Sequence, residues 1–252
     1  MSPLESAAID RRLPFGRRSG ALRLYCLPHA GGAASTYRSW VDRLPGVAVC
    51  PVQPAGREGR LREVPHRRMA ESAAELAEMI LATADGPYAV YGHSLGALVG
   101  FEALREIRRL GGPAATHLVV SGCAAPQVPF DDGPRVGGAT DAQIVGMLRR
   151  LGGTPEWLLA DPDMLAMILP PFRADFEIKE SYRYTELPPL DVPITAVCAT
   201  ADPRADGASM RGWRAQTNGP FTAHTLPGGH FAVLEQWERT RQILCEALSL
   251  PV

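Results

Sequence analysis

An α/β fold with a mostly parallel central sheet flanked by helices is the class that the sequence predicts. Short apolar runs bounded by turn residues recur along the chain, with helical patterns between them, and this alternation is typical of such sheets. One run leads directly into a Gly-x-Ser-x-Gly segment that is followed by a helix. Because 46% of the 252 residues are apolar, the chain can bury one full core, and we expect a single domain over residues 1–252.

The predicted strands are short apolar runs, and the predicted helices follow from the 3.6-residue period of their apolar positions. The strands comprise residues 22–27, 47–52, 88–91, 118–121, 194–199 and 222–226. Helices are expected at residues 69–83, 97–109 and 237–248. The second of these helices is followed by Gly111-Gly112-Pro113, which stops it.

The alternation breaks between the fourth and fifth predicted strands. Residues 126–189 contain helical patterns at 141–151, 162–169 and 171–184 but no good strand, and we interpret this insertion as a helical lid. Its apolar side chains, such as Trp157 and Phe172, form either a small core of their own or an apolar wall over a reactive site. The sequence leaves both interpretations open.

Composition excludes several classes of function. The 26 basic and 27 acidic residues give a formal net charge of −1, so no global field favours nucleic acid or an anionic membrane. The five cysteines lack Cys-x-x-Cys spacing, which argues against a disulfide framework or a zinc site. The first 20 residues are polar, and no run approaches 18 apolar residues. We therefore expect a cytoplasmic protein that is neither secreted nor membrane-spanning.

The strongest local signal is Gly92-His93-Ser94-Leu95-Gly96, which lies between a predicted strand and a predicted helix. In a Gly-x-Ser-x-Gly elbow the serine sits on a sharp strand-to-helix turn, and the flanking glycines leave room for that turn. The sequence therefore predicts Ser94 as a nucleophile, with the backbone amide of Leu95 directed at the negative charge that develops during attack.

A serine hydroxyl needs a nearby base and a carboxylate that orients the base. His230 follows the last predicted strand through a flexible turn, and Asp202 follows the fifth strand, so both stand where parallel strands place ligand-contacting groups. Asp206 is the alternative acid in the same loop. Of the other histidines, His117 and His224 are expected to have structural roles, His66 lies in a polar loop, and His93 is expected to face away from substrate. The chain order Ser94, Asp202, His230 is that of α/β-hydrolases.

An oxyanion hole requires a second backbone donor, ordinarily from the loop after an early strand. Residues 27–32 supply such a loop, and we assign its donor to the amide of Ala30, since Gly31 and Gly32 let the backbone approach closely. The two glycines are equally consistent with an ordinary flexible turn. His29 either lines the cleft or makes a structural hydrogen bond, and the sequence does not decide between these roles.

Several blocks in one order make the chain resemble the type II thioesterases of polyketide and nonribosomal peptide biosynthesis, within the α/β-hydrolase superfamily. The blocks are LPHAGG at 27–32, PAGREGR at 54–60, YGHSLG at 91–96, LGGTP at 151–155, RADF at 173–176, ADP at 201–203 and PGGHF at 227–231. The resemblance implies an α/β-hydrolase fold and a stand-alone editing enzyme. Such an enzyme removes wrong or stalled acyl groups from the phosphopantetheine arm of carrier proteins, without a metal or other cofactor.

The implied partner is an acyl or peptidyl carrier protein, and we expect the enzyme to be a monomer. Since carrier proteins of this kind are typically acidic, residues 57–68, with five arginines against Glu58 and Glu63, are a candidate docking surface. An ordinary solvated charge cluster is the alternative. Two other functions remain open: a chain-terminating thioesterase or carboxylesterase, and a non-catalytic binding module on a hydrolase fold.

Overall fold

A computed structural model describes residues 11–15, 21–129 and 135–251 of the chain. Most of the polar N-terminal stretch, and residues 130–134 of the predicted lid, lie outside the described residues. Within the described part, the helices are all too short or too polar to cross a membrane.

Six strands form one sheet, and every pairing between neighbouring strands is parallel. They are β1 (Leu22–Leu27), β2 (Val47–Pro51), β3 (Tyr88–His93), β4 (His117–Ser121), β5 (Ile194–Ala199) and β6 (Phe221–Leu226), in the order β2-β1-β3-β4-β5-β6. All six predicted strands are present, with ends that differ by at most two residues. The predicted α/β class is therefore confirmed.

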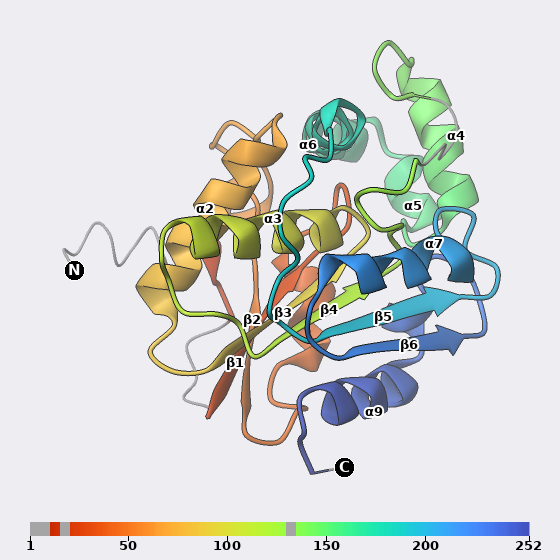
Figure 1. Ribbon diagram of the computed structural model, residues 1–252. Coiled ribbons are helices and arrows are strands. Elements are labelled where there is room, and N and C mark those ends of the chain that lie inside the picture. The colour runs from red at the N-terminus through yellow and green to blue at the C-terminus, as the bar shows by residue number, and fades with distance from the viewer. Residues whose placement is uncertain (1–10, 16–20, 130–134, 252) are drawn as a thin grey trace.

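Helices cover both faces of this sheet, as Figure 1 shows. Helices α2 (Met69–Thr83) and α3 (Leu95–Arg109) pack on one face, where they bury side chains such as Tyr25 and Val90. Helix α9 (Trp237–Ala247) and the 3-10 helix η1 (Ala34–Trp40) cover the other face. Successive strand residues alternate between the two apolar clusters because side chains on a strand point to opposite faces. This double burial explains the nearly continuous apolar runs in the sequence.

Shorter elements complete the described part of the chain. They are the 3-10 helices η2 (Glu58–Arg60) and η3 (Gly212–Gln216) and the helices α7 (Gly207–Arg211) and α8 (Ala232–Glu235). Helix α8 begins directly after the loop that carries His230.

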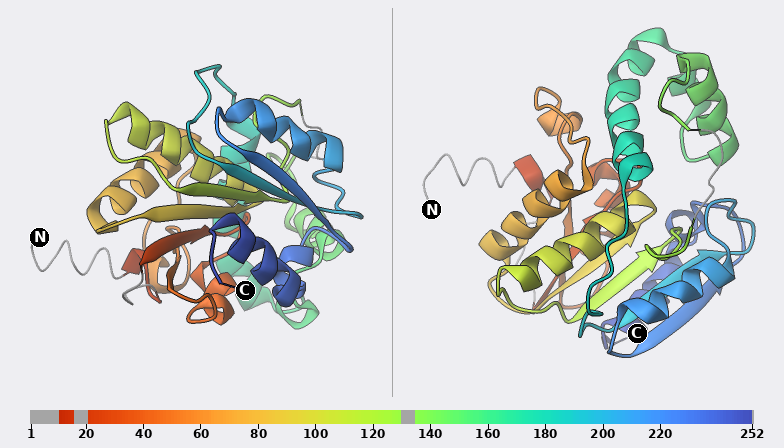
Figure 2. Two further views of the ribbon diagram at one scale, coloured as in Figure 1. Left: turned by 60° about the horizontal axis from the view of Figure 1, so that its bottom comes forward. Right: turned by 45° about the horizontal axis from the view of Figure 1, so that its top comes forward.

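The described residues between β4 and β5 form three helices, and Figure 2 shows two of them, α4 and α6, projecting away from the sheet. They are α4 (Asp141–Leu151), α5 (Glu156–Leu159) and α6 (Pro162–Ser181). The prediction for α4 is confirmed, whereas the prediction of two helices over 162–184 is wrong, because one helix continues through Pro170 and Pro171. Packing of its buried face outweighs the missing proline N–H groups.

Candidate active site

Ser94 occupies a strained turn between β3 and α3. Its backbone has φ 55° and ψ −120°, a conformation that a non-glycine residue rarely adopts and that clusters at functional sites. Its N–H donates to the carbonyl of Ser121 at 2.8 Å. A Cβ atom on Gly92 would lie 2.3 Å from the Gly96 carbonyl oxygen, and one on Gly96 would lie 2.4 Å from the Leu27 carbonyl oxygen. The elbow therefore requires both glycines.

The loops after β5 and β6 bring a carboxylate and an imidazole together. Nδ1 of His230 lies 2.9 Å and 3.0 Å from the two carboxylate oxygens of Asp202, and both side chains are almost completely buried. The Asp202 carboxylate also accepts the backbone N–H of Arg204 at 2.8 Å. Asp206, the alternative acid, instead caps α7 by accepting the N–H of Ser209 and is exposed. The carboxylate that lies against His230 is thus that of Asp202 and not that of Asp206.

Two further histidine rings surround His230. The His93 ring centroid lies 4.8 Å from that of His230, and Nδ1 of His93 bonds to the Ser121 hydroxyl. The sequence predicts only that His93 faces away from substrate. It does not predict the contact between the rings of His93 and His230. The His29 ring packs edge-on against His93 and Phe231. The imidazole that is paired with Asp202 thus lies against a group of edge-on and tilted aromatic rings.

Burial keeps these two neighbouring histidines uncharged. It lowers the pKa of His93 well below its ordinary value, and the charges of His230 and His29 act in the same direction. Burial likewise lowers the pKa of His29 to about 3, helped by the charges of His230 and Arg57. The His29 ring is partly accessible at the pocket, but its Nδ1 atom is buried without a partner in the described part of the chain. His29 therefore lines the cleft and is not the structural hydrogen bonder of the alternative interpretation.

The loop after β1 is held by hydrogen bonds from three directions. The N–H of Gly31 donates to the Asp175 carboxylate at 2.7 Å, and the carbonyl of Gly32 accepts from the Arg57 guanidinium at 3.0 Å. Within the loop, the N–H of Gly32 donates to the carbonyl of His29 at 2.9 Å. Gly31 has φ +77°, and a Cβ there would lie 2.8 Å from the Phe172 ring. The glycine pair is therefore a fixed turn and not a flexible one.

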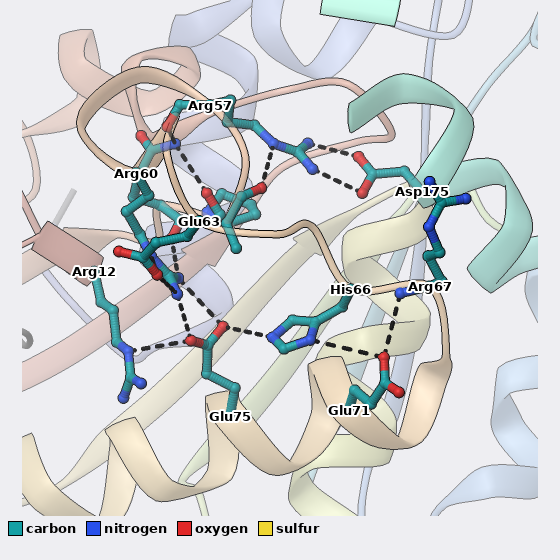
Figure 3. Close-up of polar contacts among 12 residues, drawn as sticks. Arg12, Arg57, Arg60, Glu63, His66, Arg67, Glu71, Glu75 and Asp175 are labelled. Atoms are coloured by element: carbon teal, nitrogen blue, oxygen red, sulfur yellow. Dashed lines mark hydrogen bonds and ion pairs between the residues drawn. The ribbon is translucent and has the colours of Figure 1, made fainter. Parts of the chain in front are cut away.

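Arg57 and Arg60 are buried, so these two arginines of residues 57–68 are not part of a docking surface, whereas Arg62, Arg67 and Arg68 are exposed. Arg57 is 7% exposed and forms a bidentate ion pair with Asp175, while Arg60 is 4% exposed and pairs with Glu63 and Glu75 (Figure 3). Buried, paired guanidinium groups cannot receive a partner protein. The sequence alone does not show that Arg57 and Arg67 pair with Asp175 and Glu177, because these two carboxylates lie on α6, far along the chain.

Ser94 and His230 line one pocket of about 430 Å³ together with the lid. Ala30, from the loop after β1, also lines it, whereas Leu95 is the first residue of α3 and is not among the lining residues. The lid side chains in the wall are mostly apolar and include Leu148, Leu151, Leu158, Met167, Ile168, Phe172 and Phe176. Several of these also belong to a small apolar cluster within the lid. Side chains such as Phe172 and Phe176 thus serve both as core and as pocket wall, whereas Trp157 is exposed and belongs to neither.

The remaining histidines lie elsewhere. His117 bonds to Thr195 across neighbouring strands, His224 lies on the edge strand β6, and His66 contacts Glu75. A larger open groove runs between α2, α3 and the end of α6, and the described residues that line it include none of the predicted site residues. In the described ranges, we find no group of three His, Cys, Asp or Glu side chains that can hold a metal ion.

The fold and the site together define an α/β-hydrolase, with a serine elbow after β3 and a His–Asp pair after β5 and β6. Comparison with known families agrees, because the model of the thioesterase domain matches residues 22–249. The chain belongs to this family, and the protein is a thioesterase.

Individual relatives are similar over almost the whole chain. The gramicidin S biosynthesis protein GrsT of Aneurinibacillus migulanus is 38% identical, over 91% of this chain and 90% of that protein. The structure of RedJ, a thioesterase from the prodiginine biosynthetic pathway of Streptomyces coelicolor, superposes with a TM-score of 0.82 at 38% identity, over 90% of this chain and 85% of RedJ. BorB, a type II thioesterase from the borrelidin biosynthetic cluster, superposes with a TM-score of 0.83 at 36% identity, over 92% of this chain and 96% of BorB.

Proposed function

We propose that this protein is a stand-alone editing thioesterase that removes aberrant or stalled acyl groups from the phosphopantetheine arm of acyl or peptidyl carrier proteins. The observation that carries the proposal is the convergence of Ser94 and the Asp202-paired His230 on one pocket with an apolar wall. Similarity to BorB, a type II thioesterase, and to proteins of gramicidin S and prodiginine biosynthesis supports the pathway assignment. The enzyme acts as a single-domain, cytoplasmic monomer.

The reaction proceeds through an acyl-enzyme. The Ser94 hydroxyl oxygen attacks the thioester carbonyl carbon, and Nε2 of His230 takes its proton. The carbon–sulfur bond then breaks, and the phosphopantetheine sulfur leaves with that proton. A water molecule, deprotonated by His230, then attacks the acyl carbon. The bond between this carbon and the Ser94 oxygen breaks, His230 returns the proton to that oxygen, and the carboxylic acid leaves. Asp202 holds the imidazole through Nδ1 and stabilises its protonated form.

Backbone amides stabilise the negative oxygen of both tetrahedral intermediates. The donors are the N–H groups of Leu95 and Ala30, which flank the nucleophile from the helix start and from the loop after β1. A helix N-terminus adds its partial positive charge to the first donor. The acyl chain lies along the apolar lid side chains, so the lid selects acyl groups by shape and not by charge. No metal or other cofactor enters this mechanism.

The direct test is hydrolysis of short acyl groups from a carrier protein by the Ser94→Ala variant. We expect activity to fall by about 10⁴-fold or more, because triad members act as a unit. Retained turnover would refute the mechanism. A matched oxygen ester separates the thioesterase from a carboxylesterase, and a cyclic product would indicate a chain-terminating enzyme. Failure of a fluorophosphonate probe to label Ser94 would favour a non-catalytic binding module.

A further inference from the structure

A buried ion pair joins the lid to the loop that carries the proposed oxyanion donor. The guanidinium of Arg57 donates to both oxygens of Asp175, at 2.6 Å and 2.8 Å. Arg57 lies in the loop after β2, and Asp175 lies on lid helix α6. Each partner also reaches the loop after β1, because Arg57 donates to the Gly32 carbonyl and Asp175 accepts the Gly31 N–H. Two charged side chains thus hold two successive residues of that loop.

These contacts determine where the Ala30 N–H points. With Gly31 and Gly32 fixed, the Gly32 N–H donates to the His29 carbonyl at 2.9 Å. That carbonyl and the Ala30 N–H belong to the same peptide group, which is planar and trans, so they point in opposite directions. Fixing the carbonyl toward Gly32 therefore directs the Ala30 N–H away from it. Rotation of this peptide would remove the donor from the pocket.

We propose that Arg57 and Asp175 are positioning residues that set the oxyanion hole and tie it to helix α6. The proposal rests on the proposed function, since it presupposes that Ala30 stabilises an oxyanion. Neither side chain touches the reacting atoms in this scheme, and both act through the Ala30 peptide. Their geometry fits this role because a guanidinium fork can bind a carboxylate with two donors and still reach a carbonyl.

Stability alone is a poor explanation for this pair. Taking two charges out of water costs free energy that their attraction often fails to recover, and apolar replacements are commonly tolerated. Both side chains are only 8% exposed. The same two segments already share a second ion pair, between Arg67 and Glu177, which is exposed and lies two residues further along helix α6. The buried pair differs from it by its contacts with the oxyanion loop.

The test compares Asp175→Asn and the double variant Arg57→Met/Asp175→Leu with the parent enzyme on a short acyl thioester. Asp175→Asn keeps the shape of the side chain, and the double variant leaves neither charge of the pair buried. A urea unfolding midpoint like that of the parent enzyme shows that a variant keeps its fold. We expect kcat to fall by about 10- to 100-fold, which is a smaller loss than removal of an oxyanion donor causes. KM should stay within about twofold of the parent value. The inhibition constant of a trifluoromethyl ketone analogue, whose adduct with Ser94 carries the oxyanion, should rise by the same factor.

Arg67→Gln is the matched control, because it breaks the exposed ion pair between the same segments and should leave kcat and inhibitor affinity unchanged. A folded double variant with kcat and inhibitor affinity within about threefold of the parent would overturn the inference, as would an equal loss in Arg67→Gln. Retained turnover in Ser94→Ala would overturn the proposed function together with the inference. An inactive Ser94→Ala beside a fully active double variant would overturn the inference alone.

Discussion

At the scale of single residues, the contact between Asp202 and His230 leads to a sharp prediction. In Asp202→Asn the amide replaces a carboxylate that accepts the Nδ1 proton of His230, so the imidazole loses the partner that fixes its tautomer. We expect kcat for thioester hydrolysis to fall by about 10³- to 10⁴-fold with little change in the urea midpoint. Asp206→Asn is the control in the same loop. Because asparagine also caps helices, this variant should keep both stability and activity, and a comparable loss there would contradict the assignment of the acid.

Among single residues, the sequence predicts the side chains whose positions follow from the order of the strands. Ser94, Asp202 and His230 each follow a strand, and parallel strands end at the same edge of the sheet, so their order predicted the observed pairing of Asp202 with His230. The contact of Arg57 with Asp175 joins residues 118 positions apart. It depends on how α6 lies over the sheet, which no local pattern encodes.

At the scale of elements, the close approach of α3 to β1 predicts opposite effects of alanine at two helical glycines. A Cβ on Gly96 would lie 2.4 Å from the Leu27 carbonyl oxygen, whereas the nearest atom to a Cβ on Gly146 in α4 is 3.6 Å away. We expect Gly96→Ala to lower the free energy of unfolding by about 3 kcal/mol, since backbone must shift. Gly146→Ala should raise it by about 0.5–1 kcal/mol, because alanine is the better helix former. Urea unfolding measures both, and a stabilised Gly96→Ala would contradict the described elbow.

Elements with a regular apolar period were predictable from sequence, and those shaped by tertiary packing were not. Strands β2, β3 and β5 are buried on both faces, so their apolar runs are nearly continuous and easily recognised. The sequence predicts a break in α6 at Pro170, because proline normally ends a helix. In the folded protein, Phe172 and Phe176 pack in the lid cluster and hold the helix continuous across that position. The short helix α5 carries too few turns to show a period.

At the scale of the whole molecule, buried neutral histidines make stability depend on pH. Burial lowers the pKa of His117 to about 4 and that of His93 well below its ordinary value, whereas both titrate near 6.5 in an unfolded chain. Between those values the unfolded chain binds protons that the folded protein does not. Stability is therefore complete above about pH 6.5 and is lost as the pH falls. Glu75, whose pKa is lowered to about 2 chiefly by its hydrogen bonds with His66 and Arg60 against the opposing effect of burial, adds to this loss only below about pH 4.5.

The variant His117→Gln removes one of the histidines that take up a proton on unfolding. His117 stands at the start of β4, bonded to Thr195 and away from the Ser94 pocket, so activity at pH 7.5 should be unchanged. Urea unfolding between pH 6 and pH 4.5 should show a slope shallower than that of the parent by about 1 kcal/mol per pH unit, because unfolding then takes up one proton fewer. An unchanged slope would mean that His117 is already protonated in the folded protein. In that case the acid sensitivity would arise from His93 and its neighbours in the candidate active site, and fluorophosphonate labelling of Ser94 would weaken in parallel with stability.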